Sequence, residues 1–165
     1  NTQNKNFIVD TGISTYNIGK ERTLQRSSKA HNTLVVNHQN SSQIWSGFRV
    51  AKRAKVKIIS ENNQKIIAQH DGYKNEGILH QRSFEASDNC FTISDELLGD
   101  IQGKDCKGYL HFSPEIDFLK LNSSEIICNN GVKISFENCT NIEIEKYDLC
   151  LGYNKYQIAK KIIYN

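Results

Sequence analysis

The residues best suited to chemistry lie near the start of the chain, where a carboxylate and an imidazole each stand beside an apolar run. Asp10 follows the apolar residues 7–9, and His31 precedes the apolar residues 34–36. If the two runs are strands, the side chains could meet across a sheet, and Asp and His are both donors that zinc binds in tetrahedral sites. Two donors are too few for a metal site. From residue type alone, structural roles are favoured, with Asp10 capping a turn and His31 as a satisfied imidazole at a strand edge.

A second group of polar residues follows the middle of the chain. His70 and Tyr73 flank the turn signal Asp71-Gly72, and His80 comes soon after. Histidine is the usual acid or base near neutral pH, and a tyrosine with a lowered pKa can take up a proton, so a cleft could form here. A hairpin with exposed polar residues is the favoured alternative.

Trp45 and Arg49 could together hold a sugar. Trp45 is the only tryptophan of the chain. An aromatic face stacks on sugar C–H groups, and arginine pairs bidentately with carboxylate or sulfate. A core tryptophan explains Trp45 equally well. The basic residues within 49–57 have two interpretations. The favoured one is the solvated face of a strand, and the alternative is a cationic rim that binds an acidic polymer.

The sequence pattern predicts an all-β domain. Residues 55–58, 133–136 and 141–145 alternate apolar and polar side chains, which is typical of half-buried antiparallel strands. Asn130-Gly131 between two apolar runs indicates a hairpin. Helical periodicity is nearly absent, and its best candidate, residues 94–98, is too short to assign. We therefore expect about a dozen strands in two packed antiparallel sheets. That fold class by itself does not define a function.

Composition further limits the class of protein. The 165 residues fit one domain, 1–165, and the absence of Met suggests a piece of a longer protein. A net charge of +3 is too weak to indicate nucleic-acid binding. The longest apolar stretches are too short to span a membrane. The five cysteines include no CxxC, so the spacing of a zinc ribbon is absent. Buried or half-buried thiols are favoured, and a disulfide among them is the alternative.

The N-terminal third resembles a known family, the heparinase II/III-like polysaccharide lyases. The resemblance rests on four features. The first two are an apolar strand ending in Asp-x-Gly, here residues 7–12, and a nearby tyrosine, Tyr16. The others are an arginine, Arg22, and an Arg-Ser-[ST]-x-Ala-His-Asn-Thr run, here residues 26–33. Residues 41–54 resemble a branch found among bacterial polysaccharide gene clusters. The resemblance is strong over residues 7–54 and looser to about residue 116.

This resemblance implies a C-terminal β-sandwich of the super-sandwich type, packed against an N-terminal (α/α) toroid that the sequence lacks. It implies β-elimination from a uronic-acid polysaccharide, with the sandwich contributing a cleft wall and part of a metal site. In related lyases zinc is held by a His-x-His motif, the Asp of Asp-x-Gly and the His of His-Asn-Thr, so Asp10 and His31 are the expected metal ligands. A His-x-His motif should precede Asp10, but only nine residues do. The zinc site is therefore expected to be incomplete, and the chain alone inactive.

No catalytic residue is assigned within the chain, and its expected partners are an acidic polysaccharide or oligosaccharide and the helical domain. The resemblance favours the periplasm, whereas a biosynthetic-cluster branch would be cytoplasmic. A non-catalytic carbohydrate-binding or surface-polysaccharide-assembly domain is the alternative function. The expected substrate-binding residues are Tyr16, Arg22, Arg26, Asn32, Trp45, Arg49, His70 and Tyr73.

Overall fold

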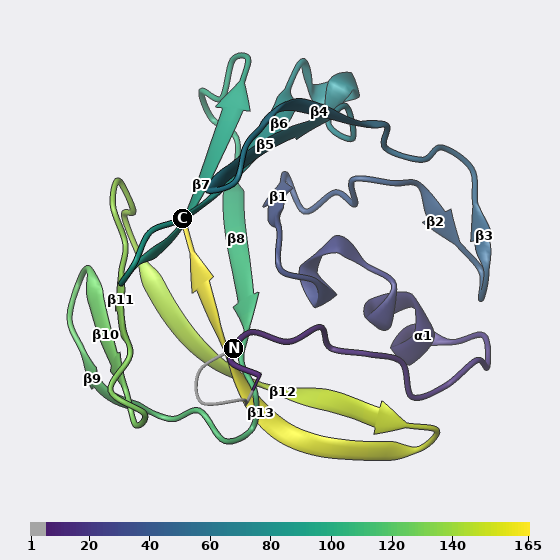
Figure 1. Ribbon diagram of the computed structural model, residues 1–165. Coiled ribbons are helices and arrows are strands. Elements are labelled where there is room, and N and C mark those ends of the chain that lie inside the picture. The colour runs from purple at the N-terminus through teal and green to yellow at the C-terminus, as the bar shows by residue number, and fades with distance from the viewer. Residues whose placement is uncertain (1–5) are drawn as a thin grey trace.

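Antiparallel sheets are the main regular structure of the protein. The computed structural model describes residues 6–165, except for the side chains of residues 120 and 121. One four-stranded sheet has the order β1-β8-β13-β12 and a second has the order β4-β5-β6-β7 (Figure 1). The remaining strands form the three-stranded sheet β11-β10-β9 and the ribbon β2-β3. The expected all-β, antiparallel sandwich is thus confirmed.

The strands of the first sheet are β1 (Leu34–Val36), β8 (Cys106–His111), β12 (Ile142–Gly152) and β13 (Lys155–Tyr164). Those of the second are β4 (Val56–Glu61), β5 (Lys65–His70), β6 (Leu79–Ala86) and β7 (Phe91–Leu98). The short strands are β2 (Ile44–Trp45), β3 (Arg49–Val50), β9 (Phe118–Leu121), β10 (Glu125–Cys128) and β11 (Lys133–Ser135). Three short helices complete the fold: α1 (Lys20–Gln25), η1 (Ser28–Ala30) and η2 (Lys74–Glu76).

Alternation along the strands produces the core. On β8 the side chain of Leu110 faces inward, opposite Ile162 of β13. These two pack with Ile126 and Cys128 of the small sheet, and Ile93 of β7 lies against the cluster. Burying one such aliphatic side chain contributes about 1.5–3 kcal/mol, so this cluster holds three of the sheets together.

Residues on the opposite face of β8 point away from that core. Since neighbouring residues alternate, Tyr109 and His111 share the outer face. The N-terminal segment, α1 and η1 lie on this side, and the β12–β13 hairpin extends below them (Figure 1). Gly12 is needed for this packing, because its φ is +72° and a Cβ would lie 2.7 Å from the carbonyl oxygen of Cys150.

Two local expectations differ from the structure. Residues 94–98, the best helical candidate, belong to strand β7, and the only α-helix in residues 6–165 is α1, which the pattern did not predict. The stretch containing residues 55–58 forms β4 as expected, but β4 is an exposed edge strand along its whole length. The Asn130-Gly131 hairpin is confirmed, with β10 and β11 paired antiparallel around it.

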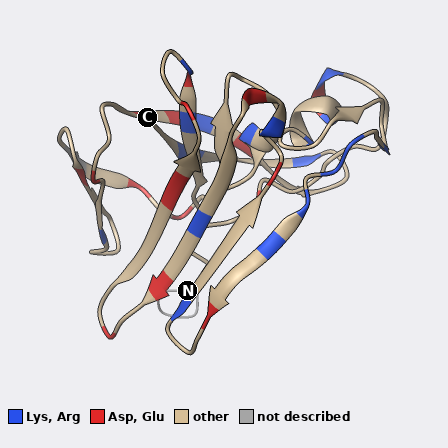
Figure 2. Ribbon diagram, turned by 90° about the horizontal axis from the view of Figure 1, so that it is seen from above, with Lys and Arg blue, Asp and Glu red and all other residues tan. Residues whose placement is uncertain are grey.

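Charged groups of both signs are spread over most of the ribbon. The exception runs from β3 into β4, where Figure 2 shows successive basic residues with no acidic residue between them. In the described part of the chain, no helix is long and apolar enough to cross a membrane. The five cysteines are free thiols.

Candidate functional site

Asp10 and His31 meet at the surface, as their position in the sequence suggested. Asp10 Oδ2 lies 2.6 Å from His31 Nδ1, and both side chains are partly exposed. The other Asp10 oxygen accepts the backbone N–H of Gly12 at 3.0 Å, so Asp10 also caps its own turn. If His31 is neutral, this contact places its proton on Nδ1, which leaves Nε2 with a free lone pair.

The electrostatics of the pair favour an ionised Asp10. Partial burial acts to raise the pKa of Asp10, but the hydrogen bonds from His31 and from the Gly12 N–H outweigh it. The net result is a pKa below the ordinary value of an aspartate. A carboxylate that stays charged holds the imidazole in one orientation.

Asn32 fixes the two segments that carry this pair. Its Nδ2 donates to the Val9 carbonyl at 2.9 Å, and its Oδ1 accepts the His111 backbone N–H at 2.7 Å. The Val9 N–H in turn donates to the His111 carbonyl at 2.9 Å. The residues before Asp10 and after His31 are therefore both bound to the end of β8.

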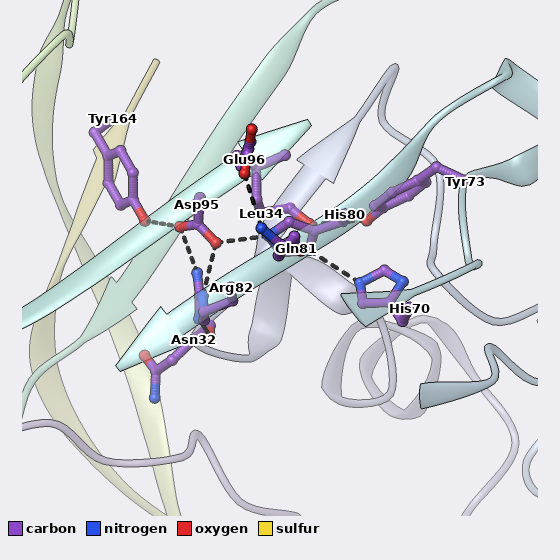
Figure 3. A network of polar contacts seen from close by, with 10 residues as sticks. All are labelled: Asn32, Leu34, His70, Tyr73, His80, Gln81, Arg82, Asp95, Glu96 and Tyr164. Carbon is purple, nitrogen blue, oxygen red and sulfur yellow. Dashed lines mark hydrogen bonds and ion pairs between the residues drawn. The ribbon is translucent and has the colours of Figure 1, made fainter. Parts of the chain in front are cut away.

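The largely buried ion pair between Arg82 and Asp95 also contacts the backbone of Asn32. Arg82 Nη1 donates to the Asn32 backbone carbonyl, while its Nε and Nη2 donate to the Asp95 carboxylate at 2.7 and 2.8 Å (Figure 3). The Arg82 and Asp95 side chains are only 12% and 9% exposed. Tyr164 at the end of β13 adds a further donor to Asp95 at 3.0 Å. This network ties β6, β7 and β13 to the segment beside the surface pair.

His70 and His80 extend this hydrogen-bond network, and the contacts define which ring nitrogen donates and which accepts. The Gly72 N–H donates to His70 Nδ1 at 3.1 Å, so neutral His70 carries its proton on Nε2. His70 Nε2 lies 3.0 Å from His80 Nδ1, and His80 Nε2 lies 2.6 Å from Asp95 Oδ1 (Figure 3). Each ring therefore accepts at Nδ1 and donates from Nε2.

The titration behaviour fits this arrangement. Burial, followed by the neighbouring His80, lowers the pKa of His70 from 6.5 to about 4. Burial would raise the pKa of Asp95, but hydrogen bonds from His80 and Arg82 hold it well below its ordinary value. His70 is thus neutral and Asp95 ionised at neutral pH.

A surface of exposed aromatic rings with neighbouring arginines lies on the helix and ribbon next to the N-terminal segment. Arg49 is exposed, whereas Arg22 is buried against the rings. The Arg22 guanidinium carbon is 5.5 Å from the centroid of Tyr16 and 5.4 Å from that of Phe48. Arg49 lies 4.6 Å from the ring centroid of Trp45. Trp45 is 50% exposed and Phe48 is 65% exposed, so both present ring surface to solvent. We call residues Tyr16, Arg22, Trp45, Phe48 and Arg49 the aromatic–arginine surface.

Arg26 connects the parts of this surface. Its Nη1 donates to the Ser46 carbonyl at 2.7 Å and its Nη2 to the Arg49 carbonyl at 3.0 Å. The Arg22 Nε donates to the Gly47 carbonyl at 3.0 Å. Arg22 Nη1 is buried and is the only buried side-chain nitrogen or oxygen without a hydrogen-bond partner among the described residues. The two arginines attach α1 to the β2–β3 ribbon.

The residues present do not by themselves complete a zinc site. Asp10 and His31 have suitable donor atoms, but within residues 6–165 no group of three or more His, Cys, Asp or Glu side chains could hold a metal ion. A structural zinc ion takes four protein ligands and a catalytic one takes three. Zinc therefore remains an expectation that needs ligands from outside these residues.

The expected site residues fall into three places. Asp10, His31 and Asn32 are together, and the aromatic–arginine surface with Arg26 lies nearby in sequence. His70 and Tyr73 are elsewhere: Tyr73 is 1% exposed and its hydroxyl donates to the Leu34 carbonyl at 2.8 Å. That position gives Tyr73 a structural role, and its contact with substrate stays an untested prediction.

Sequence reasoning missed Asp95 and Tyr164. The sequence pattern could have indicated Asp95. One face of β7 carries the alternate residues Phe91, Ile93, Asp95 and Leu97, so a single carboxylate lies on an otherwise apolar face. A charge in such a position needs a partner. Tyr164 carried no comparable signal.

Comparison with solved structures defines the class of domain. The heparan sulfate lyase of Pedobacter heparinus, solved as a mutant, superposes with a TM-score of 0.64 at 19% identity, covering 97% of this chain and 26% of that one. A heparinase III gene product with methylated lysines gives a TM-score of 0.67 at 20% identity, covering 98% of this chain and 25% of that one. The protein thus has the fold of a heparinase-type C-terminal β-sandwich, and it spans about a quarter of these longer chains.

The family follows from the sequence profile. The family described as "Heparinase II/III-like, C-terminal" matches residues 2–165, and the chain belongs to it. The expected resemblance is thereby confirmed, and with it the class: a C-terminal domain of heparinase II/III-like polysaccharide lyases. No curated protein matches the chain.

Proposed function

We propose that this domain forms one wall of the substrate cleft in a lyase that cleaves a uronic-acid polysaccharide by β-elimination. The observation that carries the proposal is the contact between Asp10 and His31, 2.6 Å apart at a partly exposed position. Membership of the heparinase II/III-like family supports this choice of reaction class. In that reaction a base removes the C5 proton of a uronic acid, and the 4-linked sugar leaves.

The chain's own residues can serve two needs of that reaction. Charge develops on the uronate carboxylate and must be neutralised, and a proton must reach the leaving oxygen. His31, held by Asp10, offers Nε2 as a lone-pair donor when neutral and as a hydrogen-bond donor when protonated. No residue here is assigned as the base that removes the C5 proton. The family resemblance assigns that base to a helical domain.

The aromatic–arginine surface is the second part of the proposed cleft wall. Trp45 and Tyr16 offer exposed rings for sugar stacking, and Arg49 offers a guanidinium for carboxylate or sulfate. The basic run between β3 and β4 would attract an acidic polymer to this side. The same surface also favours the second candidate function, a non-catalytic carbohydrate-binding domain.

Binding experiments test the proposal directly. The chain is titrated with a uronic-acid tetrasaccharide, and fluorescence of Trp45, the only tryptophan, reports contact with the aromatic–arginine surface. Amide chemical shifts of His31 and Asn32 report on the pair. Binding that moves both reporters, and that a neutral tetrasaccharide does not reproduce, supports the proposal. Equal response to the neutral sugar, or none to either, contradicts it.

Turnover separates the two candidate functions. Formation of the unsaturated uronate product is followed by ultraviolet absorbance, with the isolated chain and with a full-length parent lyase carrying it. We expect turnover only from the parent, and its loss in Asp10→Asn and His31→Gln. A parent that binds the polymer but never cleaves it would favour the non-catalytic domain.

A further inference from the structure

A recess lies beside the Asp10–His31 pair, on the same outer face of β8. It has a volume of about 520 Å³, within the range of sites that hold small ligands. Helix α1 and the segment after it form one side, and strands β1 and β8 form the floor. We call it the lysine recess; its lining includes Lys20, Leu24, Lys29, Val35, Asn40 and Tyr109.

The floor of the recess is apolar and fixed. Val35 of β1 and Tyr109 of β8 are both buried, at 6% and 8% exposure. Leu24 of α1 is half exposed and adds an apolar wall. A sugar ring presents a C–H face to such a surface, so the floor suits a saccharide better than a free inorganic ion.

The charged groups of the lining are cationic. Lys20 and Lys29 line the recess and no Asp or Glu does. Neither side-chain ammonium group has an ion pair or a hydrogen bond in residues 6–165. Asn40 uses its Oδ1 to accept the Ser28 N–H at 2.7 Å, which leaves its amide Nδ2 as a further donor. His38 also lines the recess, and its Nε2 lies 3.1 Å from Asp105 Oδ2. Two unpaired ammonium groups over an apolar floor favour an anionic ligand that carries a ring.

The recess and the surface pair are both attached to the same stretch of β8. Tyr109 and His111 are alternate residues of this strand, so their side chains share one face about 7 Å apart. The Tyr109 N–H donates to the Thr33 carbonyl at 3.0 Å, and the His111 N–H donates to Asn32 Oδ1 at 2.7 Å. The floor of the recess and the segment after His31 are therefore bound to the same short stretch of β8.

A third lysine lies between the two places. Lys161 of β13 is paired in register with His111, and its Nζ is 5.7 Å from the ring centroid of Tyr109. It forms an ion pair with Glu145 at 3.1 Å, which reduces its free charge. A partly neutralised cation thus lies between the recess and the pair.

We propose that the lysine recess is a binding subsite for a carboxylated or sulfated sugar unit of the same polymer chain that reaches His31. This inference depends on the proposed function only for the identity of the polymer. The two lysines would pair with the anionic group of the sugar, and Tyr109, Val35 and Leu24 would contact its ring. The subsite would set which part of the polymer lies at the Asp10–His31 pair.

The test uses the chain as it is and four probes: a non-sulfated uronic-acid tetrasaccharide, a sulfated heparan-type tetrasaccharide, a neutral tetrasaccharide and inorganic sulfate. Amide chemical shifts of Lys29, Val35 and Tyr109 report on the recess, and those of His31 and Asn32 report on the pair. The double variant Lys20→Ala/Lys29→Ala removes both free charges. The matched control Lys146→Ala/Lys155→Ala removes two exposed lysines from the β12–β13 hairpin.

We expect the acidic tetrasaccharides to shift the recess reporters and the neutral one not to. The double variant should weaken this binding roughly tenfold, since an exposed ion pair is worth about threefold to fivefold in affinity. The hairpin control should weaken it less than twofold. The sulfated and non-sulfated probes then distinguish a sulfate from a carboxylate as the preferred group.

The other outcomes are distinct. Shifts confined to the His31 reporters would overturn the subsite and leave the proposed function standing. Shifts confined to the recess would support the subsite and count against the proposed cleft. Equal weakening by the hairpin control, or inorganic sulfate binding as tightly as the sugars, would reduce the recess to non-specific charge attraction and overturn it.

Discussion

Arg82 and Asp95 form a two-pronged contact across neighbouring strands, with Nε and Nη2 donating to the two carboxylate oxygens at 2.7 and 2.8 Å. The register pairs these residues directly on β6 and β7. The third guanidinium nitrogen reaches the Asn32 carbonyl, next to His31. The core of the sandwich and the surface pair are therefore mechanically connected through one side chain.

Replacing Asp95 with Asn should be strongly destabilising. Removing one member of a buried ion pair leaves the other charge without compensation and costs about 3–5 kcal/mol. Urea unfolding followed by circular dichroism measures the change. Tyr164→Phe is the matched control, because it removes one neutral donor from the same carboxylate and should cost only about 1 kcal/mol. Similar losses in both variants would show that the ion pair is not what stabilises this region.

Gly108→Ala should disturb the same network from β8. A Cβ built at Gly108 would overlap the Tyr164 ring, so the ring must move away from Asp95. Overpacking of this kind costs about 1–3 kcal/mol. Gly19→Ala is the control, since a Cβ there meets nothing within 4 Å, and it should cost less than about 1 kcal/mol. Thermal unfolding compares the two variants, and equal melting temperatures would contradict the predicted clash.

Stability should fall as the pH drops from about 6.5 to 4. Burial lowers the pKa of His111 from 6.5 to about 4, with Lys161 adding to the effect, and the pKa of His70 is lowered similarly. In that window the unfolded chain binds protons that the folded chain does not, so unfolding is favoured progressively as the pH falls. A tenfold change in proton affinity corresponds to about 1.4 kcal/mol, so His111 contributes roughly 3–4 kcal/mol and the less buried His70 a smaller amount.

Urea midpoints at several pH values across this window measure that slope. His111→Gln should flatten it, because the titrating ring is gone while the backbone N–H that donates to Asn32 remains. Below about pH 4 the carboxylates with lowered pKa, Asp10 and Asp95, add a second loss of stability as they become protonated. A midpoint that stays constant from pH 7 to 4.5 would contradict the assignment of neutral buried histidines.

Much of the fold could be predicted because its strands depend on local alternation. Residues 141–145 alternate cleanly and all but the first lie in β12, and Asn130-Gly131 forms the expected turn. The sequence could only suggest the contact of Asp10 with His31, since that contact depends on both segments bonding to β8 through Asn32. The lysine recess could not be predicted from the sequence, because helix α1 has no apolar periodicity of its own. Arg22 and Arg26 hold this helix to the β2–β3 ribbon instead.

Arg22 offers the sharpest contrast with Arg82. Both guanidinium groups are largely removed from solvent, but Arg22 Nη1 has no hydrogen-bond partner, and the neighbours of Arg22 are the rings of Tyr16 and Phe48. Replacing a buried, incompletely paired charge by an apolar side chain of similar length is often neutral or stabilising. Arg22→Met should therefore change the free energy of unfolding by less than about 1 kcal/mol, whereas Arg82→Met should cost about 3–5 kcal/mol by removing the cation that compensates the Asp95 charge. Urea denaturation of the two variants side by side measures both values. An Arg22→Met variant as unstable as Arg82→Met would mean that the Nε contact with Gly47 and the ring contacts make Arg22 an essential part of the fold.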